Sequence, residues 1–485
     1  MARQTARRRA WVGIGLVLGV VALAAGAFGL HRWAPFTDEA AAAAAPKVTW
    51  PKNVQPVVDF VEASTKLQFL SPVKVQFIAD KKKYVARVQS PPPARTQADL
   101  DSAAISDAFG RAMGWWRGDV SVIASFDAVT AGDPFPAEWL IDDNTIVINA
   151  KDDKAKLSPF LRAELALALA QVLDDQQYHF AQRVDSATTS QQYQVLLALA
   201  VGHSLWVHDR YIDHLNGDDS STYFDELDRR NGAYQEQVSD VPLAYRALRG
   251  SGQRLGPAFI EALMQTDRTM LDAAMSTDVP DALDQISLPT GKYVTRDPLE
   301  PVADPAGPTG AHVEYSNQIG PTGLYLMLAT GMPAQQALTA SDGWGNDRYT
   351  VYTLDSTVCV DLHLVADSRL DADRLENGLN GWASARPAAS KALVARTGND
   401  LFASVCDPGT KALQPVPTDA AVNQYFGRSG MIERRAGNSG KADLAECVAI
   451  AFFARYDVSQ VNSFDPSFDL SGEIDDIEQD CVKSV

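Results

Sequence analysis

The stretch LRAELALALAQVLDDQQYHF (residues 161–180) decides the fold that we expect for this chain. Alanine and leucine fill most of its positions up to residue 173, and both residues favour the helical conformation. Glu164 is the one carboxylate before residue 174. Taken alone, this pattern predicts a long buried helix whose single carboxylate is capped or solvated.

The same stretch can be compared with the zinc-binding motif His-Glu-x-x-His. In that motif two imidazoles at positions i and i+4 lie on one helix face and bind the ion, and the glutamate acts as general base. Glu164 stands at the glutamate position, but the ligand positions hold Ala163 and Leu167. Neither side chain has a lone pair for a metal, so Glu164 is interpreted as a relic of a general base.

The N-terminus predicts a membrane anchor. Residues 11–30 carry no charge, and twenty apolar residues at about 1.5 Å each span the roughly 30 Å of a bilayer core. Arginines within the basic tail, residues 1–10, predict that this end stays in the cytoplasm. An Ala/Pro linker, residues 31–52, follows. The alternative is a cleaved signal peptide with a cleavage site near the alanines at 40–45.

Composition is typical of a globular protein, with 46% hydrophobic and 21% charged residues among 485. The formal net charge is −18, and residues 1–33 contain five arginines and no acidic residue. Removing those five positive charges leaves about −23 on the exported part, which repels nucleic acid and anionic lipid headgroups. We therefore expect no nucleic-acid partner, and the charge favours solubility.

Four cysteines lie in the last third of the chain, and an even number in an oxidising compartment predicts two disulfides. Strand patterns around the first two favour the pairs Cys359–Cys406 and Cys447–Cys481 among the three possible pairings. A four-thiolate zinc site remains an alternative, although the short C-x2-4-C spacing of such sites is missing.

Periodicity places the remaining elements. Helical spacing covers 53–67, 97–114, 191–215, 256–276, 320–341 and 371–385, and helices dominate from 158 to about 280. Strand patterns cover 72–79, 84–89, 349–366 and 401–408, a hairpin is predicted at 138–150, and prolines predict an irregular connection at 289–308. We divide the exported part into a helical domain, 53–342, and a C-terminal αβ portion, 343–485.

Five segments together resemble a family of zincin-like metallopeptidases common in actinobacterial genomes, whose motifs are HELxHAL…LxDQxF, an acidic EGDA-type motif and GWGGDRY. The match covers roughly residues 53–410, and GWGNDRY and LDDQQYHF are its most specific parts. In chain order the segments are LQFLSPVKVQFI (67–78), AEWLIDDNTIVI (137–148), AELALALAQVLDDQQYHF (163–180), ALAVGHSLWVHDRYI (198–212) and GWGNDRY (343–349).

The resemblance implies a zincin-like fold and argues against the activity. Ala163 and Leu167 stand at the two histidine positions, and Val201 stands at the third-ligand glutamate, followed by a retained Gly202. Loss of all three ligands removes the coordination shell, so no zinc and no other cofactor are expected. The remaining polar residues of the motif helix are expected to hydrogen-bond within the helix pair; they are Glu164, Asp174, Asp175 and Gln176.

Substitute ligands were sought nearby, at His179, His203, His208, Asp209 and His214. His203 and His208 are five residues apart, which rotates them by about 140° around a helix and off a common face. We interpret these histidines as exposed or internally satisfied. Trp115, Trp116 and Trp344 are either core residues or the lining of a groove.

The expected fold is therefore α+β: a helix-rich zincin-like domain with a C-terminal strand–helix–strand portion and a single N-terminal transmembrane helix. The expected function is that of a membrane-anchored extracytoplasmic pseudopeptidase, which binds a peptide, a protein partner or another component of the cell envelope. Two alternatives stay open: an active metallopeptidase with displaced ligands, and a purely structural envelope protein.

Overall fold

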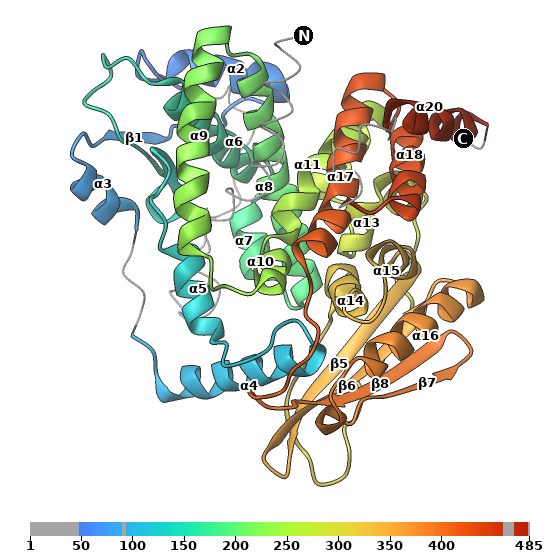
Figure 1. Ribbon diagram of the computed structural model, residues 1–485. Helices are drawn as coiled ribbons and strands as arrows, with labels where there is room; N and C mark the ends of the chain where they lie inside the picture. Colours follow the sequence, from blue (N-terminus) through green and yellow to red (C-terminus); the bar gives the residue numbers. More distant parts are fainter. Residues whose placement is uncertain (1–47, 90–93, 459–469, 484–485) are drawn as a thin grey trace. The chain divides into compact units, whose positions relative to one another are not determined.

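The computed structural model describes residues 48–89, 94–458 and 470–483, and Figure 1 shows them as a mixed α+β structure in which helices predominate. The helix-rich α+β class expected from the sequence is confirmed. The basic tail 1–10, the anchor 11–30 and most of the linker 31–52 lie outside the described residues. Among the residues that are described, no helix is both long enough and apolar enough to cross a bilayer.

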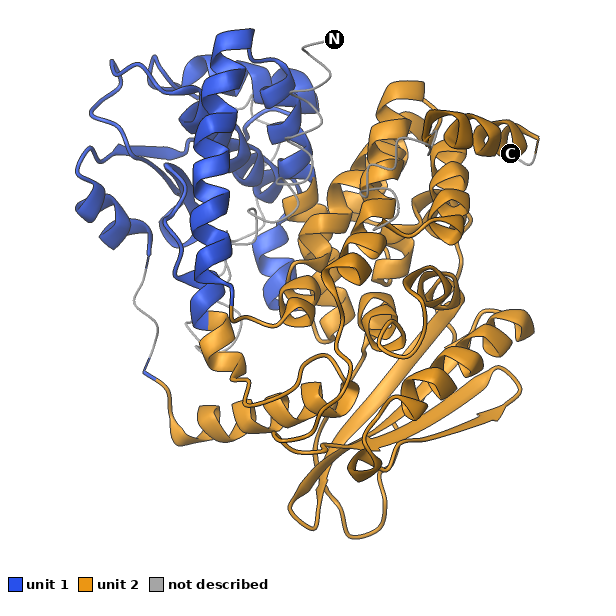
Figure 2. Cartoon of the chain, viewed as in Figure 1, with its two compact units in different colours: residues 1–94, 127–186, 203–239 blue, residues 95–126, 187–202, 240–485 orange. Residues whose placement is uncertain are grey.

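Two compact units make up the chain, and Figure 2 colours them separately. Each is built from three separate stretches of sequence. The boundary expected between residues 342 and 343 falls inside unit 2, between a helix and a strand. Unit 1 comprises residues 1–94, 127–186 and 203–239, and unit 2 comprises residues 95–126, 187–202 and 240–485.

Unit 1 contains a three-stranded sheet in the order β1-β3-β2. The central strand β3 (Thr145–Ile148) is buried at every position, pairs in parallel with β1 (Lys74–Phe77) and antiparallel with β2 (Ala137–Leu140). A 3-10 turn and Asn144, whose φ is +49°, connect β2 to β3. The hairpin predicted at 138–150 is therefore confirmed.

Helix α6 (Pro159–Tyr178) is the centre of unit 1 and corresponds to the motif stretch. Ser158 caps it by accepting a hydrogen bond from the Leu161 amide at 3.2 Å, and Pro159 occupies the first turn, where no amide partner is needed. Almost every residue up to Asp174 is buried. The other helices of unit 1 are α2 (Gln55–Thr65), α3 (Lys81–Val88), α7 (Phe180–Asp185), α9 (Gly217–Gln237) and the second half of α8 (Ser190–Asp213).

The strand predicted at 84–89 is wrong, because residues 84–88 belong to α3 and Gln89 follows its last turn. The Asp80 carboxylate accepts a hydrogen bond from the Lys83 amide at 2.8 Å and starts the helix. Tyr84 is 2% exposed and its hydroxyl donates to the Phe135 carbonyl. A single buried aromatic with mostly half-exposed or exposed neighbours marks the inner face of a short helix rather than an alternating strand.

Unit 2 contains an antiparallel five-stranded sheet in the order β4-β5-β6-β8-β7. The strand pattern at 349–366 proves to be a hairpin, because Asp355 and Ser356 adopt positive φ values of 49° and 64° and reverse the chain. Two successive residues with positive φ are typical of the tight turns that match strand twist. The strands are β4 (His312–Asn317), β5 (Trp344–Leu354), β6 (Thr357–Ala366), β7 (Leu393–Thr397) and β8 (Asp400–Cys406).

Helices α4, α14 and α16 contact this sheet, and other helices of unit 2 form a bundle beside it (Figure 1). Besides the first half of α8, the helices of unit 2 are α4 (Gln97–Met113), α10 (Leu243–Arg249), α11 (Ser251–Thr266), α12 (Arg268–Ser276), α13 (Leu283–Ser287), the π-helix η2 (Pro289–Val294), α14 (Gly320–Leu328), α15 (Ala334–Ser341), α16 (Arg369–Ser384), α17 (Asp419–Ser439), α18 (Ala442–Arg455) and α20 (Leu470–Val482). Helix α5 (Val122–Thr130) begins in unit 2 and ends in unit 1.

The helices predicted at 256–276 and 320–341 are each divided in two. In the second case Pro333 cannot continue a helix, and Gly331 lies against the chain at residues 381–382. A Cβ atom on Gly331 would come within 2.3 Å of the Trp382 amide nitrogen. Close backbone packing therefore fixes the break between α14 and α15.

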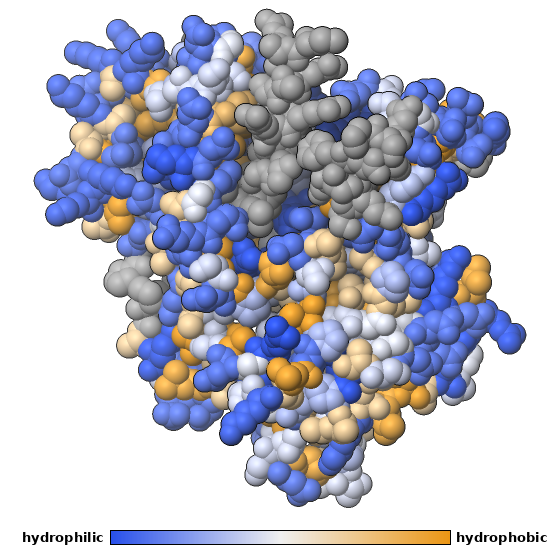
Figure 3. All heavy atoms as spheres, in the orientation of Figure 1, coloured by the Kyte–Doolittle hydropathy of each residue, from blue (hydrophilic) through white to orange (hydrophobic). Residues whose placement is uncertain are grey.

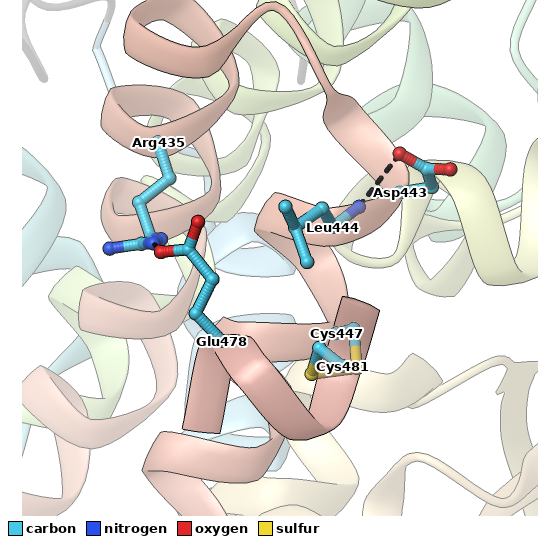
Figure 4. The surroundings of a disulfide bond; sticks show 6 residues. All are labelled: Arg435, Asp443, Leu444, Cys447, Glu478 and Cys481. Atoms are coloured by element: carbon cyan, nitrogen blue, oxygen red, sulfur yellow. Dashed lines mark hydrogen bonds and ion pairs between the residues drawn. A yellow bond between two sulfur atoms is a disulfide. The ribbon is translucent and has the colours of Figure 1, made fainter. Parts of the chain in front are cut away.

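Both disulfides of the structure are the pairs that the sequence favours. Cys359 on β6 stands opposite Cys406 on β8 in the strand register. Figure 4 shows Cys447 on α18 joined to Cys481 on α20, with Arg435 of α17 directed at Glu478 of α20. The bridge and the ion pair tie the last described helix to the bundle of unit 2.

Hydrophilic residues cover most of the face drawn in Figure 3, and hydrophobic ones are scattered between them. This distribution agrees with the formal net charge of −18. A surface of this kind favours solubility.

Candidate functional site

Two buried histidines of α8 each contact a carboxylate of α6 within unit 1. The Nδ1 atom of His203 lies 2.8 and 2.9 Å from the two carboxylate oxygens of Asp174. The Nε2 atom of His208 lies 3.4 Å from Oε1 of Glu164. All four side chains are at most 6% exposed, so two buried polar cross-links join the motif helix to its neighbour.

His208 has three polar neighbours. Its Nδ1 atom lies 3.2 Å from the Asp209 carboxylate, and its Nε2 atom is 3.5 Å from the Tyr223 hydroxyl as well as close to Glu164. Burial alone would lower the pKa of His208, but attraction to Glu164 and hydrogen bonds to Asp209 and Glu164 outweigh it and raise the pKa to about 10. At neutral pH this imidazole is therefore a cation.

Glu164 is 1% exposed, and its second carboxylate oxygen, Oε2, has no hydrogen-bond partner among the described residues. A second carboxylate, Glu138 of β2, influences the same region. Burial and then the nearby charge of Glu164 raise the pKa of Glu138 to about 8, although a hydrogen bond from the Phe135 amide opposes the shift. Glu138 is therefore mostly protonated at neutral pH, and the region carries one ion pair rather than two adjacent anions.

The positions expected for metal ligands hold no donors. Ala163 is fully buried and Leu167 is 3% exposed, and both face the packed interior of unit 1. Val201 lies on α8 two residues before His203, at the end of the segment that unit 2 contributes to this helix. Whether these three residues converge on one point, as the resemblance implies, stays a prediction.

A zinc ion does not fit the side chains present. The nearest carboxylate, Glu164, already interacts with a protonated imidazole, and a cationic histidine cannot coordinate a metal. Throughout residues 48–89, 94–458 and 470–483, no three His, Cys, Asp or Glu side chains are grouped to hold an ion. Displaced ligation by His179 or His214 is not supported either, because both side chains are exposed, and His214 lies against the Phe60 ring.

The expectation that four polar residues hydrogen-bond within the helix pair is correct for Glu164 and Asp174 only. The Asp175 carboxylate accepts a hydrogen bond from the Ala181 amide at 2.8 Å and caps α7. The Gln176 side chain binds the chain near residue 70, accepting from the amides of Leu70 and Ser71. These two residues therefore fix loops rather than the contact with α8.

The arrangement around His208 is suited to holding charge and not to moving protons. A general base works best with a pKa near the operating pH, whereas His208 stays protonated until about pH 10. Glu164 and His208 are at most 2% exposed, which keeps bulk water away from both. The pair can therefore stabilise the contact between α6 and α8, but it lacks a free base and access for a substrate.

A second buried ionic group occurs in unit 2 around Lys292 of the π-helix η2. Its ammonium lies 2.6 Å from Asp297 and 3.6 Å from Asp284 and also hydrogen-bonds Asp367. Burial raises the pKa of Asp284 to about 7 despite the opposing effect of Lys292. One oxygen of Asp284 is buried without a partner in the described part of the chain, so this carboxylate is poorly compensated.

Sequence reasoning considered His203 and His208 as ligands and interpreted them as exposed or internally satisfied; both are buried and each contacts a carboxylate. It missed that each one meets a different acid of α6. Tyr223 of α9 and Glu138 of β2 were not considered at all. The ten-residue spacing between Glu164 and Asp174 is about 2.8 helical turns, which leaves the two carboxylates about 80° apart around the helix. This separation was the signal that could have indicated two distinct contacts with one neighbouring helix.

Comparison with known proteins gives one match. A family model described as a domain of unknown function (DUF8575) matches residues 311–407. This segment holds the five-stranded sheet with α14, α15 and α16, and it ends just after Cys406. No curated protein and no solved structure matches the chain.

Proposed function

We propose that this chain is a membrane-anchored, extracytoplasmic pseudopeptidase of zincin-like fold that acts in the cell envelope by binding rather than by hydrolysis. The observation that carries the proposal is the buried ion pair between Glu164 and His208, beside apolar residues at the ligand positions. A peptidase of this kind needs its glutamate free to take a proton from a metal-bound water.

The local chemistry supports a structural use of the former catalytic residue. Glu164 attracts the protonated His208 at 3.4 Å and is 1% exposed. Ala163 and Leu167 exclude water on the same helix. Reversing this state would require new ligands and an opened path to solvent, since catalytic zinc sites keep one coordination position open for water.

The proposed location outside the cytoplasm is supported by separate observations. Two disulfides are typical of proteins that fold in an oxidising compartment. The uncharged stretch at 11–30 after an arginine-rich tail is typical of an anchor with its N-terminus in the cytoplasm. Protease added to intact cells should therefore degrade the part of the chain after residue 50, and full protection of that part would refute the topology.

Metal analysis tests the loss of peptidase chemistry. The full chain, purified in detergent after growth with added zinc, should hold no stoichiometric zinc and show no chelator-sensitive proteolysis. One tightly bound zinc per chain would refute the proposal. His312→Ala is the matched control for zinc bound adventitiously, because this imidazole is 80% exposed and far from the motif helix in sequence.

A gain-of-ligand variant tests the alignment on which the zincin-like reading depends. The triple change Ala163→His, Leu167→His and Val201→Glu should create zinc binding if the three positions converge. Activity need not return, since the partners that orient metal ligands can also be lost. A folded triple variant that binds no zinc would show that the three positions do not correspond to the family's ligands.

A further inference from the structure

Unit 2 contains a small cavity of about 170 Å³ that is lined by three aromatic, three aliphatic and six polar residues. The aromatic residues are called its aromatic side, and the polar residues its polar side. None of the residues that line it carries a charge. Seven elements contribute to its lining: α4, α8, α10, α11, α13, α14 and β5. An engineered cavity of about 150 Å³ binds benzene, so this volume suits a single six-membered ring.

The aromatic side is formed by Phe109, Trp115 and Tyr349. Phe109 and Tyr349 are stacked with centroids 5.0 Å apart, and Trp115 meets Phe109 edge to face at 5.2 Å. The indole Nε1 atom of Trp115 donates to the Gly323 carbonyl at 3.3 Å. Because the rings hold one another and one is tied to the backbone, they present a fixed apolar surface to a ligand.

Neutral side chains form the polar side, and several of their atoms lack partners within the described residues. Gln194 accepts hydrogen bonds at Oε1 from Ser251 and Gly252, while its Nε2 atom donates to none of these residues. Gln318 donates through Nε2 to Asn346 and has no donor for its Oε1 atom. The Tyr349 hydroxyl is likewise unpaired in the described part of the chain. One amide donor, one amide acceptor and one phenol are thus available to a molecule in the cavity.

We propose that this cavity binds one neutral pyranose ring, as a free monosaccharide or as the end of an envelope glycan. A sugar ring has an apolar face that can lie on the aromatic side. Its hydroxyls both donate and accept, so they can satisfy Gln194, Gln318 and Tyr349 together. A charged sugar is excluded, because the lining offers no counter-charge for a group removed from water.

This inference concerns unit 2 and does not depend on the proposed loss of peptidase chemistry. Zinc in the purified chain would refute that proposal and leave sugar binding untouched. Conversely, a chain that binds no sugar can still be free of zinc. The two proposals therefore fail separately.

The test is calorimetric titration of the full chain with neutral hexoses and pentoses, with glucuronic acid and glucosamine as charged probes. A ligand of about a dozen heavy atoms should bind with a Kd on the order of 1 mM. Tyr349→Phe retains the stacked ring and removes only the hydroxyl, so it should weaken binding about fivefold. Tyr352→Phe is the matched control on the same strand, because this side chain bonds Asp361 and does not line the cavity.

Gln194→Met, which keeps the side-chain length and removes the amide, is the second variant and should also weaken binding. Neutral polysaccharides with and without a capped non-reducing end separate the two sources of the ring: a glycan-end site binds the uncapped chain more tightly than the free sugar. Several results would overturn the proposal. They are no binding of any neutral sugar, equal binding of the charged probes, or an affinity that neither Tyr349→Phe nor Gln194→Met changes.

Discussion

The buried pair between Glu164 and His208 can be dissected with a double-mutant cycle. His208→Leu leaves the Glu164 carboxylate buried without a positive partner, whereas Glu164→Met leaves the imidazole with the Asp209 carboxylate and the Tyr223 hydroxyl. Asp209 is 32% exposed and can be solvated, so the histidine variant should be the more damaging of the two. The double variant replaces both charged groups by apolar side chains of similar size.

The distance between the two charges sets the magnitude. At 3.4 Å the attraction is about 5 kcal/mol for an effective dielectric constant of about 20. Desolvation of both groups offsets most of it, yet removing one partner of a buried pair costs about 3–5 kcal/mol. His208→Leu should therefore lose about 3–5 kcal/mol of unfolding free energy, and the double variant should recover at least 2 kcal/mol relative to the sum of the singles.

Urea unfolding of the full chain followed by tryptophan fluorescence and circular dichroism measures these differences. His312→Leu removes an imidazole that is 80% exposed and should change stability by no more than about 0.5 kcal/mol. Additive single variants, or a His208→Leu variant as stable as the wild type, would show that Glu164 and His208 do not form the buried pair described above.

Three further predictions follow from the same contacts. The pKa of His208 is raised to about 10, so the stability that this group contributes is complete below about pH 6.5 and declines as the pH rises through 10; the wild-type urea midpoint should fall between pH 7 and 10 more steeply than that of the double variant. The pKa of Asp284 is raised to about 7, so the free energy of unfolding declines as the pH rises from about 4 to about 7 and stays level above that; at pH 8 the free energy of unfolding of Asp284→Asn should exceed that of the wild type by about 1 kcal/mol, and at pH 4 it should be no higher. Cys406→Ala opens a loop of 47 residues, whose closure should be worth about 4 kcal/mol in the chain-entropy model; an unchanged melting temperature under oxidising conditions would contradict this.

Much of the helical part of the fold can be predicted from sequence, because its apolar periodicity is strong. The boundaries of α4 and α16 lie within two residues of the predicted 97–114 and 371–385. The disulfide Cys359–Cys406 could also be predicted, because both cysteines lie in clear strand patterns. Local pattern and final structure agree wherever the burial of one face decides the conformation.

The failures occur where tertiary contacts decide instead. Residues 84–89 alternate like a strand but form a helix, because the Asp80 cap and the burial of Tyr84 favour that conformation. The reversal at Asp355 and Ser356 lacks glycine, so the hairpin within 349–366 carries only the weaker turn signal of an Asp-Ser pair. The spacing of the histidines on α8 was compared with that of ligands to a single metal ion, whereas His203 and His208 make two separate contacts with α6.

The resemblance to zincin-like peptidases draws attention to helices α6 and α8, but it does not identify the residues that join them. Motif comparison selects Ala163, Leu167 and Val201 as the positions where the zincin-like family would hold its ligands, and nothing in those three residues indicates the buried histidine–carboxylate contacts nearby. The contacts of His208 also involve the Tyr223 hydroxyl of α9, which lies outside the five segments that carry the resemblance. The cavity of unit 2 was even less predictable, because its lining comes from seven elements spread over 241 residues between Phe109 and Tyr349.

Each unit is built from separate stretches of the chain, and this constrains when each unit can finish folding during synthesis and how it can be exchanged between proteins in evolution. Unit 1 needs residues 203–239 for its histidines, so a nascent chain cannot complete it until about half of the sequence has been made. Neither unit can be transferred to another protein as one uninterrupted gene fragment. The sheet with α14, α15 and α16 is different, because residues 311–407 encode it continuously together with its own disulfide. We therefore expect recombination to have moved this segment alone, with insertions tolerated at its ends and not inside unit 1.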